Sequence, residues 1–416
     1  MLKIGSSTYY NKLEWLYRRC LEFLERYETE AFSTKTFETM WLNTDKLVYN
    51  LNNVRKKGHG GKRYDNVEER ILQTHIVVTS DVQTRYVLRS DVAYDWNITL
   101  EQLEQDTVYY KDDHIDNFSR KNERYRFPFA PQPPTLADTQ STLEYNDERA
   151  KFEKRKMYID GLHVNSSYTT YAQLWLIKRM VDAKEWRMIT DDDASLYNSF
   201  FRVFSKEVSL GEAHHFITIV DKSKSLQETF KEYQEGRKEL TAWGISNGVV
   251  DSSISRVAYL KLKKQLENHT FHTEILRNGK TYRKWGNNKI THPLPSIDQG
   301  WYNVDCTSDL SSYEPKQIAK MILQVSDKST NAFLQQIRRR LNILERPLVT
   351  ARGDKKSYIY SNFNPQYAQY AVTILRTFYN FCLPYRSSND EQKLTPAQRM
   401  GLTNKIFSIQ DILYFK

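Results

Sequence analysis

The chain has 416 residues, which is enough for two or three domains with a sizeable hydrophobic core. Lys and Arg number 61 and Asp and Glu 51, so the formal charge is +10, which favours a polyanionic partner without requiring one. Three scattered cysteines cannot build a disulfide framework or a Cys-x-x-Cys metal site, and no apolar run suits a membrane span or a signal peptide. We therefore expect a folded cytoplasmic protein and neither a secreted nor a membrane protein.

Residues 1–66 are expected to form a helical DNA-binding domain. Apolar side chains recur at helical spacing over residues 13–24, and further helices are predicted from about residue 33 and, capped by Thr44, over residues 44–58. Short helices of which the last is basic are the outline of a helix-turn-helix. Without DNA, the same cations are explained by the helix dipole, which favours positive charge in the last turn. The side chains expected to contact DNA here are Lys46, Arg55, Lys56 and Lys57.

The pattern then changes to alternating strands and helices. Residues 71–81 form a nearly continuous apolar run that predicts a buried strand, and a second strand follows at hairpin distance. Residues 99–150 lose this periodicity and are predicted to be an insertion or an extended arm. Strands and helices resume at residue 156, so we expect an α/β fold with a mixed sheet flanked by helices. The expected divisions are 67–221 for the first part of this core, 222–315 for a helix-rich insertion, and 316–416 for the end of the core and a C-terminal tail.

Carboxylates follow two of the predicted strands. Asp81 ends the first apolar run, and Asp191 ends a strand predicted over residues 185–190. Strand ends that meet in an open sheet form a crevice, where converging carboxylates can bind Mg²⁺ through oxygen. Two such ions can promote phosphoryl transfer by activating the attacking oxygen and stabilising the leaving one. Asp193 lies on the same side of the strand as Asp191 and is a further candidate ligand, but such acids also cap helices, and a helix is predicted from Ser195.

Several stretches carry a resemblance to a known family. They are Thr190–Leu196 after a predicted helix and strand, a predicted helix over Asn331–Leu344, and a closing block in which Thr377–Phe381 precedes Leu394–Leu402. Together with Asp81 they resemble the ribonuclease-H-like catalytic core of bacterial insertion-sequence transposases. The resemblance runs from the first predicted strand to the C-terminus, and the closing block is its most specific part.

The resemblance implies a DDE-type mechanism. In such a mechanism three acids hold two divalent ions, Mg²⁺ or Mn²⁺, while double-stranded DNA is cut at the element ends and joined to a target. Asp81 matches the first acid and Asp191 the second, and Asp160 at another predicted strand end is the alternative to Asp81. The resemblance also implies a homo-oligomer on DNA, because two ends must be brought together.

The third acid departs from the family pattern. Its expected position, ahead of an arginine-rich stretch on the predicted helix, holds the neutral Asn331. Asp327 lies one turn earlier on the same helical face and is the preferred substitute, and Glu345 is a more distant one. The cations expected to contact the DNA backbone near this helix are Arg338, Arg339 and Arg340.

Three functions follow as hypotheses. The first is a DDE-type transposase that cleaves and joins DNA. The second is a decayed or domesticated transposase that only binds DNA, which Asn331 favours because an amide is a poorer cation ligand. The scattered cysteines favour it too, since they cannot build the N-terminal zinc ribbon of related transposases. The third, weaker hypothesis is a metal-dependent nuclease or resolvase that cleaves without joining.

Overall fold

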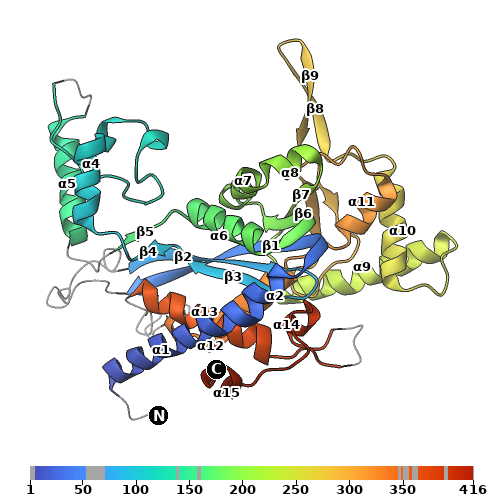
Figure 1. Ribbon diagram of the computed structural model, residues 1–416. Coiled ribbons are helices and arrows are strands. Elements are labelled where there is room, and N and C mark those ends of the chain that lie inside the picture. Colours follow the sequence, from blue (N-terminus) through green and yellow to red (C-terminus); the bar gives the residue numbers. More distant parts are fainter. Residues whose placement is uncertain are drawn as a thin grey trace.

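The computed structural model describes residues 5–52, 71–136, 140–156, 161–344, 348–349, 356–357, 364–387 and 392–415. Its core is a seven-stranded sheet of order β10-β11-β7-β6-β1-β2-β3 (Figure 1). In chain order these strands are β1 (Thr36–Asn52), β2 (Ile71–Asp81), β3 (Val87–Val92), β6 (Asp182–Asp191), β7 (Ala213–Val220), β10 (Ile290–Thr291) and β11 (Tyr302–Cys306).

The sheet is mixed. β1, β2 and β3 form an antiparallel meander, β6 lies parallel to β1 on its other side, and β7 lies parallel to β6. β11 continues the sheet antiparallel to β7, and β10 pairs with β11. The expected α/β fold with a mixed sheet flanked by helices is therefore confirmed.

Helices cover both faces of the sheet. α6 and α7 lie on one side of it, and α12 and α13 lie on the other (Figure 1). The helices are α1 (Ser6–Leu24), α2 (Glu30–Ser33), α4 (Leu100–Tyr110), α5 (Thr142–Lys156), α6 (Ser166–Met180), α7 (Ala194–Val203), α8 (Ser205–Leu210), α9 (Leu226–Ser246), α10 (Ile254–Leu266), α11 (Pro315–Ile322), α12 (Lys328–Arg340), α13 (Pro365–Cys382), α14 (Pro396–Arg399) and α15 (Ile409–Leu413). None of the helices in the described ranges is long and apolar enough to span a membrane.

The helices predicted from about residue 33 and over residues 44–58 are wrong where the chain is described, because residues 36–52 form strand β1, next to the middle strand of the sheet. Burial alternates in the later part of this segment: Leu47 and Tyr49 are buried, whereas Val48 between them is 49% exposed. A period of two residues is the signature of a strand. Pairing on both edges, with β2 and with β6, supplies hydrogen bonds that no local pattern reveals. The described part of residues 1–66 is thus one helical stretch followed by a strand of the core sheet, and no helix-turn-helix is described there.

The first helical stretch is attached to the end of the chain. α1 packs against α13, and a π-helical turn η1 (Glu25–Thr29) carries the buried Glu28. Arg376 of α13 donates hydrogen bonds of 2.7 and 2.9 Å to the two carboxylate oxygens of Glu28. The N-terminal helix and the C-terminal closing helix therefore belong to one packed body.

The outer edge of β3 is closed by side chains of α13. Asn380 accepts a hydrogen bond from the Val87 amide at 2.9 Å and donates one to the Val87 carbonyl at 2.8 Å. Gln369 accepts from the Val92 amide and donates to the Ser90 carbonyl. Because an exposed strand edge can pair with another chain, these amides protect the sheet as a further strand would.

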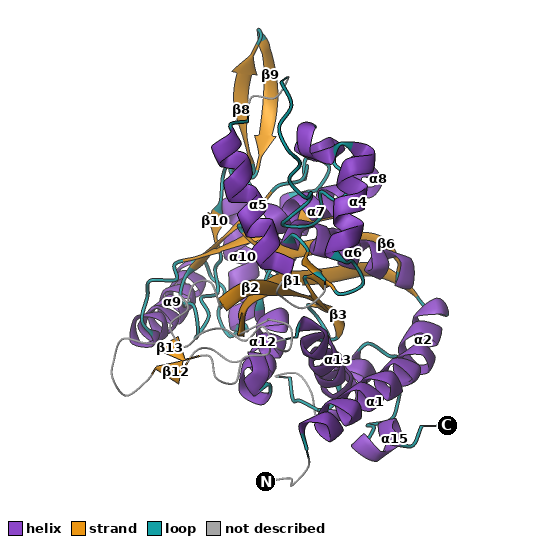
Figure 2. Ribbon diagram, turned by 90° about the vertical axis from the view of Figure 1, so that its left-hand side faces the viewer, coloured by secondary structure: helices purple, strands orange, loops and turns teal. Residues whose placement is uncertain are grey.

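Two segments extend away from the sheet. The insertion predicted over residues 99–150 contains α4 and most of α5, which pack on each other at one end of the molecule (Figure 1). A two-stranded sheet of β8 (His272–Arg277) and β9 (Lys280–Trp285) projects from another part of the molecule, as Figure 2 shows. The remaining short strands are β4 (Tyr94–Asp95), β5 (Leu162–His163), β12 (Leu348–Val349) and β13 (Lys356–Ser357).

Candidate active site

Two carboxylates lie side by side where β1 passes the end of β6. The parallel register pairs Asn43 with Ile189, and Asp45 and Asp191 each come two residues later. Asn43 faces α12, because its side-chain oxygen accepts hydrogen bonds from the Thr330 amide at 3.1 Å and from the Ser329 hydroxyl at 3.3 Å. Residues two apart share a face of a strand, so Asp45 is on the face that α12 covers.

The surroundings of Asp45 disfavour the ionised form of its carboxyl group. Burial, followed by the charges of Asp191 and Asp327, raises its pKa to about 6, against the opposing hydrogen bond from the Lys46 backbone amide at 2.6 Å. A carboxyl group whose pKa is raised by neighbouring negative charges lies close to the groups that carry them. A bound cation would relieve that repulsion.

Asp327 precedes the first residue of α12 and contributes the third acid. Its Oδ2 accepts hydrogen bonds from the side-chain amide of Gln299 at 2.5 Å and from the side-chain amide of Asn331 at 2.7 Å. Burial raises the pKa of Asp327, and the charge of Asp191 acts in the same direction. Asp327, the preferred third acid, therefore lies on the same face of the sheet as Asp45. Asn331 lies one helical turn beyond it.

A cation already faces these acids. The Lys222 ammonium, just after β7, lies 2.9 Å from Oδ2 of Asp191. Its pKa is raised by that hydrogen bond, by the charge of Asp191, and further by the charges of Asp45 and Asp327. The Lys222 side chain is 79% exposed, so this pair is a weak surface ion pair that another cation could displace.

Asp81, the predicted first acid, lies elsewhere. β1 separates β2 from β6, and the register pairs Asp81 with Leu42, three residues or about 10 Å before Asp45 along β1. Oδ2 of Asp81 accepts hydrogen bonds of 2.7 Å from both the amide and the hydroxyl of Thr84 in the β2–β3 turn. The expectation that Asp81 and Asp191 end adjacent strands at one edge is therefore wrong. Asp160, the alternative, lies outside the described residues.

Asp193 caps the start of α7, which is the alternative role expected for it from the sequence. Its Oδ1 accepts hydrogen bonds from the Ser195 amide at 2.9 Å and the Ser195 hydroxyl at 2.6 Å, at the start of α7. Its Oδ2 lies 2.7 Å from the ammonium of Lys46, which is mostly buried. Two residues named for other roles, Asp193 as a metal ligand and Lys46 as a DNA contact, thus hold each other at the start of this helix.

The chemistry of the acids fits a divalent cation. Mg²⁺ takes oxygen ligands and is commonly held by one or two carboxylates, with water and phosphate oxygens completing the shell. Asp45 and Asp191 supply such a pair, and Asp327 adds charge nearby. Within the described ranges, however, no three His, Cys, Asp or Glu side chains converge closely enough to surround one ion. The arrangement therefore suits one ion on the carboxylate pair more directly than two ions on three acids.

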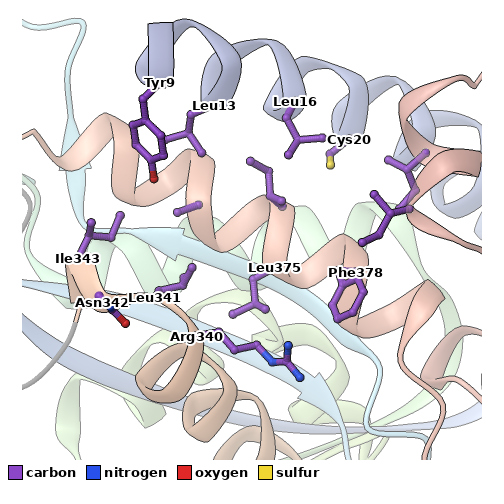
Figure 3. A pocket seen from close by; sticks show the side chains of 14 residues that line it. Tyr9, Leu13, Leu16, Cys20, Arg340, Leu341, Asn342, Ile343, Leu375 and Phe378 are labelled. Carbon is purple, nitrogen blue, oxygen red and sulfur yellow. The ribbon is translucent and has the colours of Figure 1, made fainter. Parts of the chain in front are cut away.

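Apart from Lys46, the predicted DNA-contacting cations fall into two groups. Arg339 and Arg340 are exposed at the last turn of α12, with Arg338 partly buried beside them. Arg340 also borders an apolar groove of about 580 Å³ between α1, α13 and the end of α12 (Figure 3). The cations Arg55, Lys56 and Lys57, and the distant acid Glu345, lie outside the described residues.

Asp45 is the site residue that sequence reasoning missed. The signal in the sequence was weak, because apolar residues lie on both sides of Asp45 without a strict period of two, and Thr44 and the basic end of the segment also suit a helix. Lys222 gave no signal, since a lysine after a strand is ordinary. Comparisons of the chain with protein-family models, with curated proteins and with solved structures found no match.

Proposed function

We propose that this protein is a divalent-metal-dependent enzyme of the DDE transposase type, which cleaves and joins double-stranded DNA. The observation that carries the proposal is the placement of Asp45 beside Asp191 on neighbouring parallel strands, with Asp327 near enough for its charge to raise the pKa of Asp45. A mixed sheet flanked by helices is also what the resemblance to a ribonuclease-H-like core implies.

The pattern on which the resemblance rests fits Asp45 better than Asp81. That pattern places the first acid in a first strand that is followed by a paired strand. With β1 as the first strand and β2 as its antiparallel partner, the acid at this position is Asp45. The second acid remains Asp191, and the third is Asp327, whose carboxylate is held by Gln299 and Asn331.

Each acid has a definite task in this proposal. Asp45 and Asp191 would hold Mg²⁺ or Mn²⁺ between them, and Asp327 would complete the negative field. A bound ion would supply Lewis-acid stabilisation of the charge that develops on the transferring phosphate. The chain itself orients the acids on a rigid sheet and orders Asp327 by two amide hydrogen bonds. The net charge of +10 favours the polyanionic substrate.

The test is a cleavage and strand-transfer assay on a plasmid that carries the DNA flanking this reading frame, with Mg²⁺ or Mn²⁺. Asp45→Asn and Asp191→Asn are each expected to lower cleavage by more than about 100-fold, because metal ligands are at least as critical as the groups that orient them. Asp81→Asn is the matched control, since it makes the same chemical change at another buried acid of the sheet, and is expected to retain cleavage. Full cleavage in both Asp45→Asn and Asp191→Asn would refute the proposal.

A second candidate is a protein of the same origin that binds DNA without cutting it. Two observations favour it: the Lys222 ammonium pairs with Asp191, and no three-carboxylate cluster is formed by the residues described. In this case the native chain would bind duplex DNA and give no cleaved product with either metal. Joined products would exclude both this candidate and a nuclease or resolvase that only cuts.

Oligomerisation on DNA and a cytoplasmic, nucleoid-associated location are parts of the transposase proposal.

A further inference from the structure

The β8–β9 hairpin projects from the body of the molecule, as both views of the ribbon show (Figures 1 and 2). Its strands pair from His272 with Trp285 to Arg277 with Lys280. The turn is Asn278-Gly279, and both residues have positive φ, 53° and 72°. This is the two-residue turn chemistry that matches the twist of a hairpin, so the sequence itself specifies a tight, regular ribbon.

The root of the hairpin is fixed to the sheet. The Gly286 amide donates a hydrogen bond of 2.9 Å to the carbonyl of Cys306 on β11. Trp285 packs on His272 with ring centroids 4.7 Å apart, and Phe271 is buried in the core below them. Beyond this root, all the residues from Glu274 to Lys284 that belong to the two strands are exposed.

The two faces of the ribbon differ. One face carries Ile275 opposite Tyr282 at its centre, with Arg277 opposite Lys280 at the tip and Lys284 toward the root. The other face carries Leu276 opposite Thr281, and Glu274 opposite Arg283. The first face therefore combines cations with an exposed aromatic ring, and it lacks an acidic residue.

The charges of the first face are uncompensated. Across the described ranges, no carboxylate forms an ion pair with Arg277, Lys280 or Lys284. Arg277 and Lys280 stand directly opposite each other, an arrangement that destabilises a pair of strands. A polyanion bound at the tip would remove that repulsion. This charge pattern therefore favours a polyanion as the partner of the hairpin.

We propose that the β8–β9 hairpin is a DNA-contacting ribbon that lies against a groove of a duplex, with Arg277, Lys280 and Lys284 on phosphates and Tyr282 between them. The proposal rests on the proposed function, because it names the element that holds the DNA substrate. A six-residue strand spans about 20 Å, and the major groove, about 12 Å wide, admits a two-stranded ribbon. A second copy of the chain is a poorer partner, since two ribbons of like charge repel each other.

The test compares two triple variants of the full chain. Arg277→Ala/Lys280→Ala/Lys284→Ala removes the cations of the hairpin face. Lys231→Ala/Lys238→Ala/Lys320→Ala removes three exposed cations from α9 and α11 and is the matched control. Binding of a 30-base-pair duplex is followed by fluorescence anisotropy at several salt concentrations. The hairpin variant is expected to bind at least about 10-fold more weakly, with the slope of log affinity against log salt reduced by about two to three.

The outcomes separate this inference from the proposed function. Equal binding by the hairpin variant and the control, with the native chain binding tightly, would overturn the hairpin proposal and leave the proposed function intact. Absence of duplex binding by the native chain would overturn both. Loss of self-association in sedimentation without loss of DNA binding would make the hairpin an assembly arm and would also overturn the inference. Unchanged thermal melting of both variants verifies that folding is not the cause.

Discussion

Lys222 and Asp191 form an ion pair of 2.9 Å on the acidic face between β1 and α12. The lysine is largely exposed, so the pair contributes little to stability and the ammonium is free to leave. Its position makes it a competitor for any cation that the acids bind.

Replacement of this lysine tests that competition. Lys222→Ala is expected to raise the affinity for Mn²⁺ by about 3- to 10-fold, because removal of one cation leaves the acids more strongly repelled. Titration calorimetry or electron paramagnetic resonance of free Mn²⁺ measures the change. Lys224→Ala is the matched control, since Lys224 pairs with Glu232 instead. Weaker Mn²⁺ binding by Lys222→Ala would contradict this account.

Replacement of Asp45 by a neutral residue is expected to stabilise the protein at high pH. The Asp45 pKa of about 6 in the folded chain lies above the ordinary value of about 3.9, so its contribution to stability is present at low pH and is lost as the pH rises through 6. At pH 8 the ionised group costs about 1–2 kcal/mol after allowance for its partial exposure. In a chelating buffer, Asp45→Asn should therefore melt about 2–4 °C higher at pH 8.

At pH 4.5 the same substitution should raise the melting temperature less, because Asp45 is then mostly protonated in the folded chain. Thermal denaturation of both proteins at the two pH values makes the comparison. An equal shift at both values would mean that the gain comes from packing and not from relief of charge.

The position of Asn331 predicts a metal-dependent effect. The side-chain amide of Asn331 donates a hydrogen bond of 2.7 Å to Asp327, so Asn331→Glu replaces a hydrogen-bond donor with a second carboxylate. Without metal, the variant should be less stable at pH 8, since two acids repel. With Mg²⁺ its melting temperature should rise more than that of the native chain, because a further oxygen ligand joins the site. Asn331→Gln is the neutral control, and equal Mg²⁺ shifts in all three proteins would exclude α12 from the metal site.

The buried ion pair of Glu28 and Arg376 predicts how the two ends of the chain depend on each other. The hydroxyl of Tyr86 donates a further hydrogen bond of 2.6 Å to Glu28. Arg376→Met leaves the carboxylate buried and unpaired, and is expected to lower the free energy of unfolding by about 3–5 kcal/mol. Urea denaturation measures the loss. The double variant Glu28→Gln/Arg376→Met should recover part of it, and no recovery would mean that packing of the arginine stem dominates.

Much of the fold could be predicted from local patterns. The strand over residues 71–81, the helix ahead of β6 and the strand that ends at Asp191 follow from apolar periodicity, because their burial is continuous or regular over many residues. β1 could not be assigned, since its apolar residues suit both a short amphipathic helix and a strand with one exposed position. Its neighbours in the sheet, far away in sequence, decide between the two.

The candidate site divides in the same way. Asp191 and Asp327 could be named from the sequence, because one ends a strand and the other begins a helix on a suitable face. Asp45 and Lys222 could not, since their roles depend on which strands lie next to each other. Asp81 illustrates the converse: it ends a buried strand as expected, but β1 lies between it and Asp191.

The amino-acid sequence by itself determined the positive charge and the alternation of strands and helices, because these depend on composition and on residues that are close along the chain. Only the tertiary structure decided that Asp45 faces Asp191, that Lys222 pairs with Asp191, and that the side-chain amides of α13 close the edge of β3. These relationships are set by strand order and register. Both are fixed by pairing and burial between distant segments, which no local spacing of residues encodes.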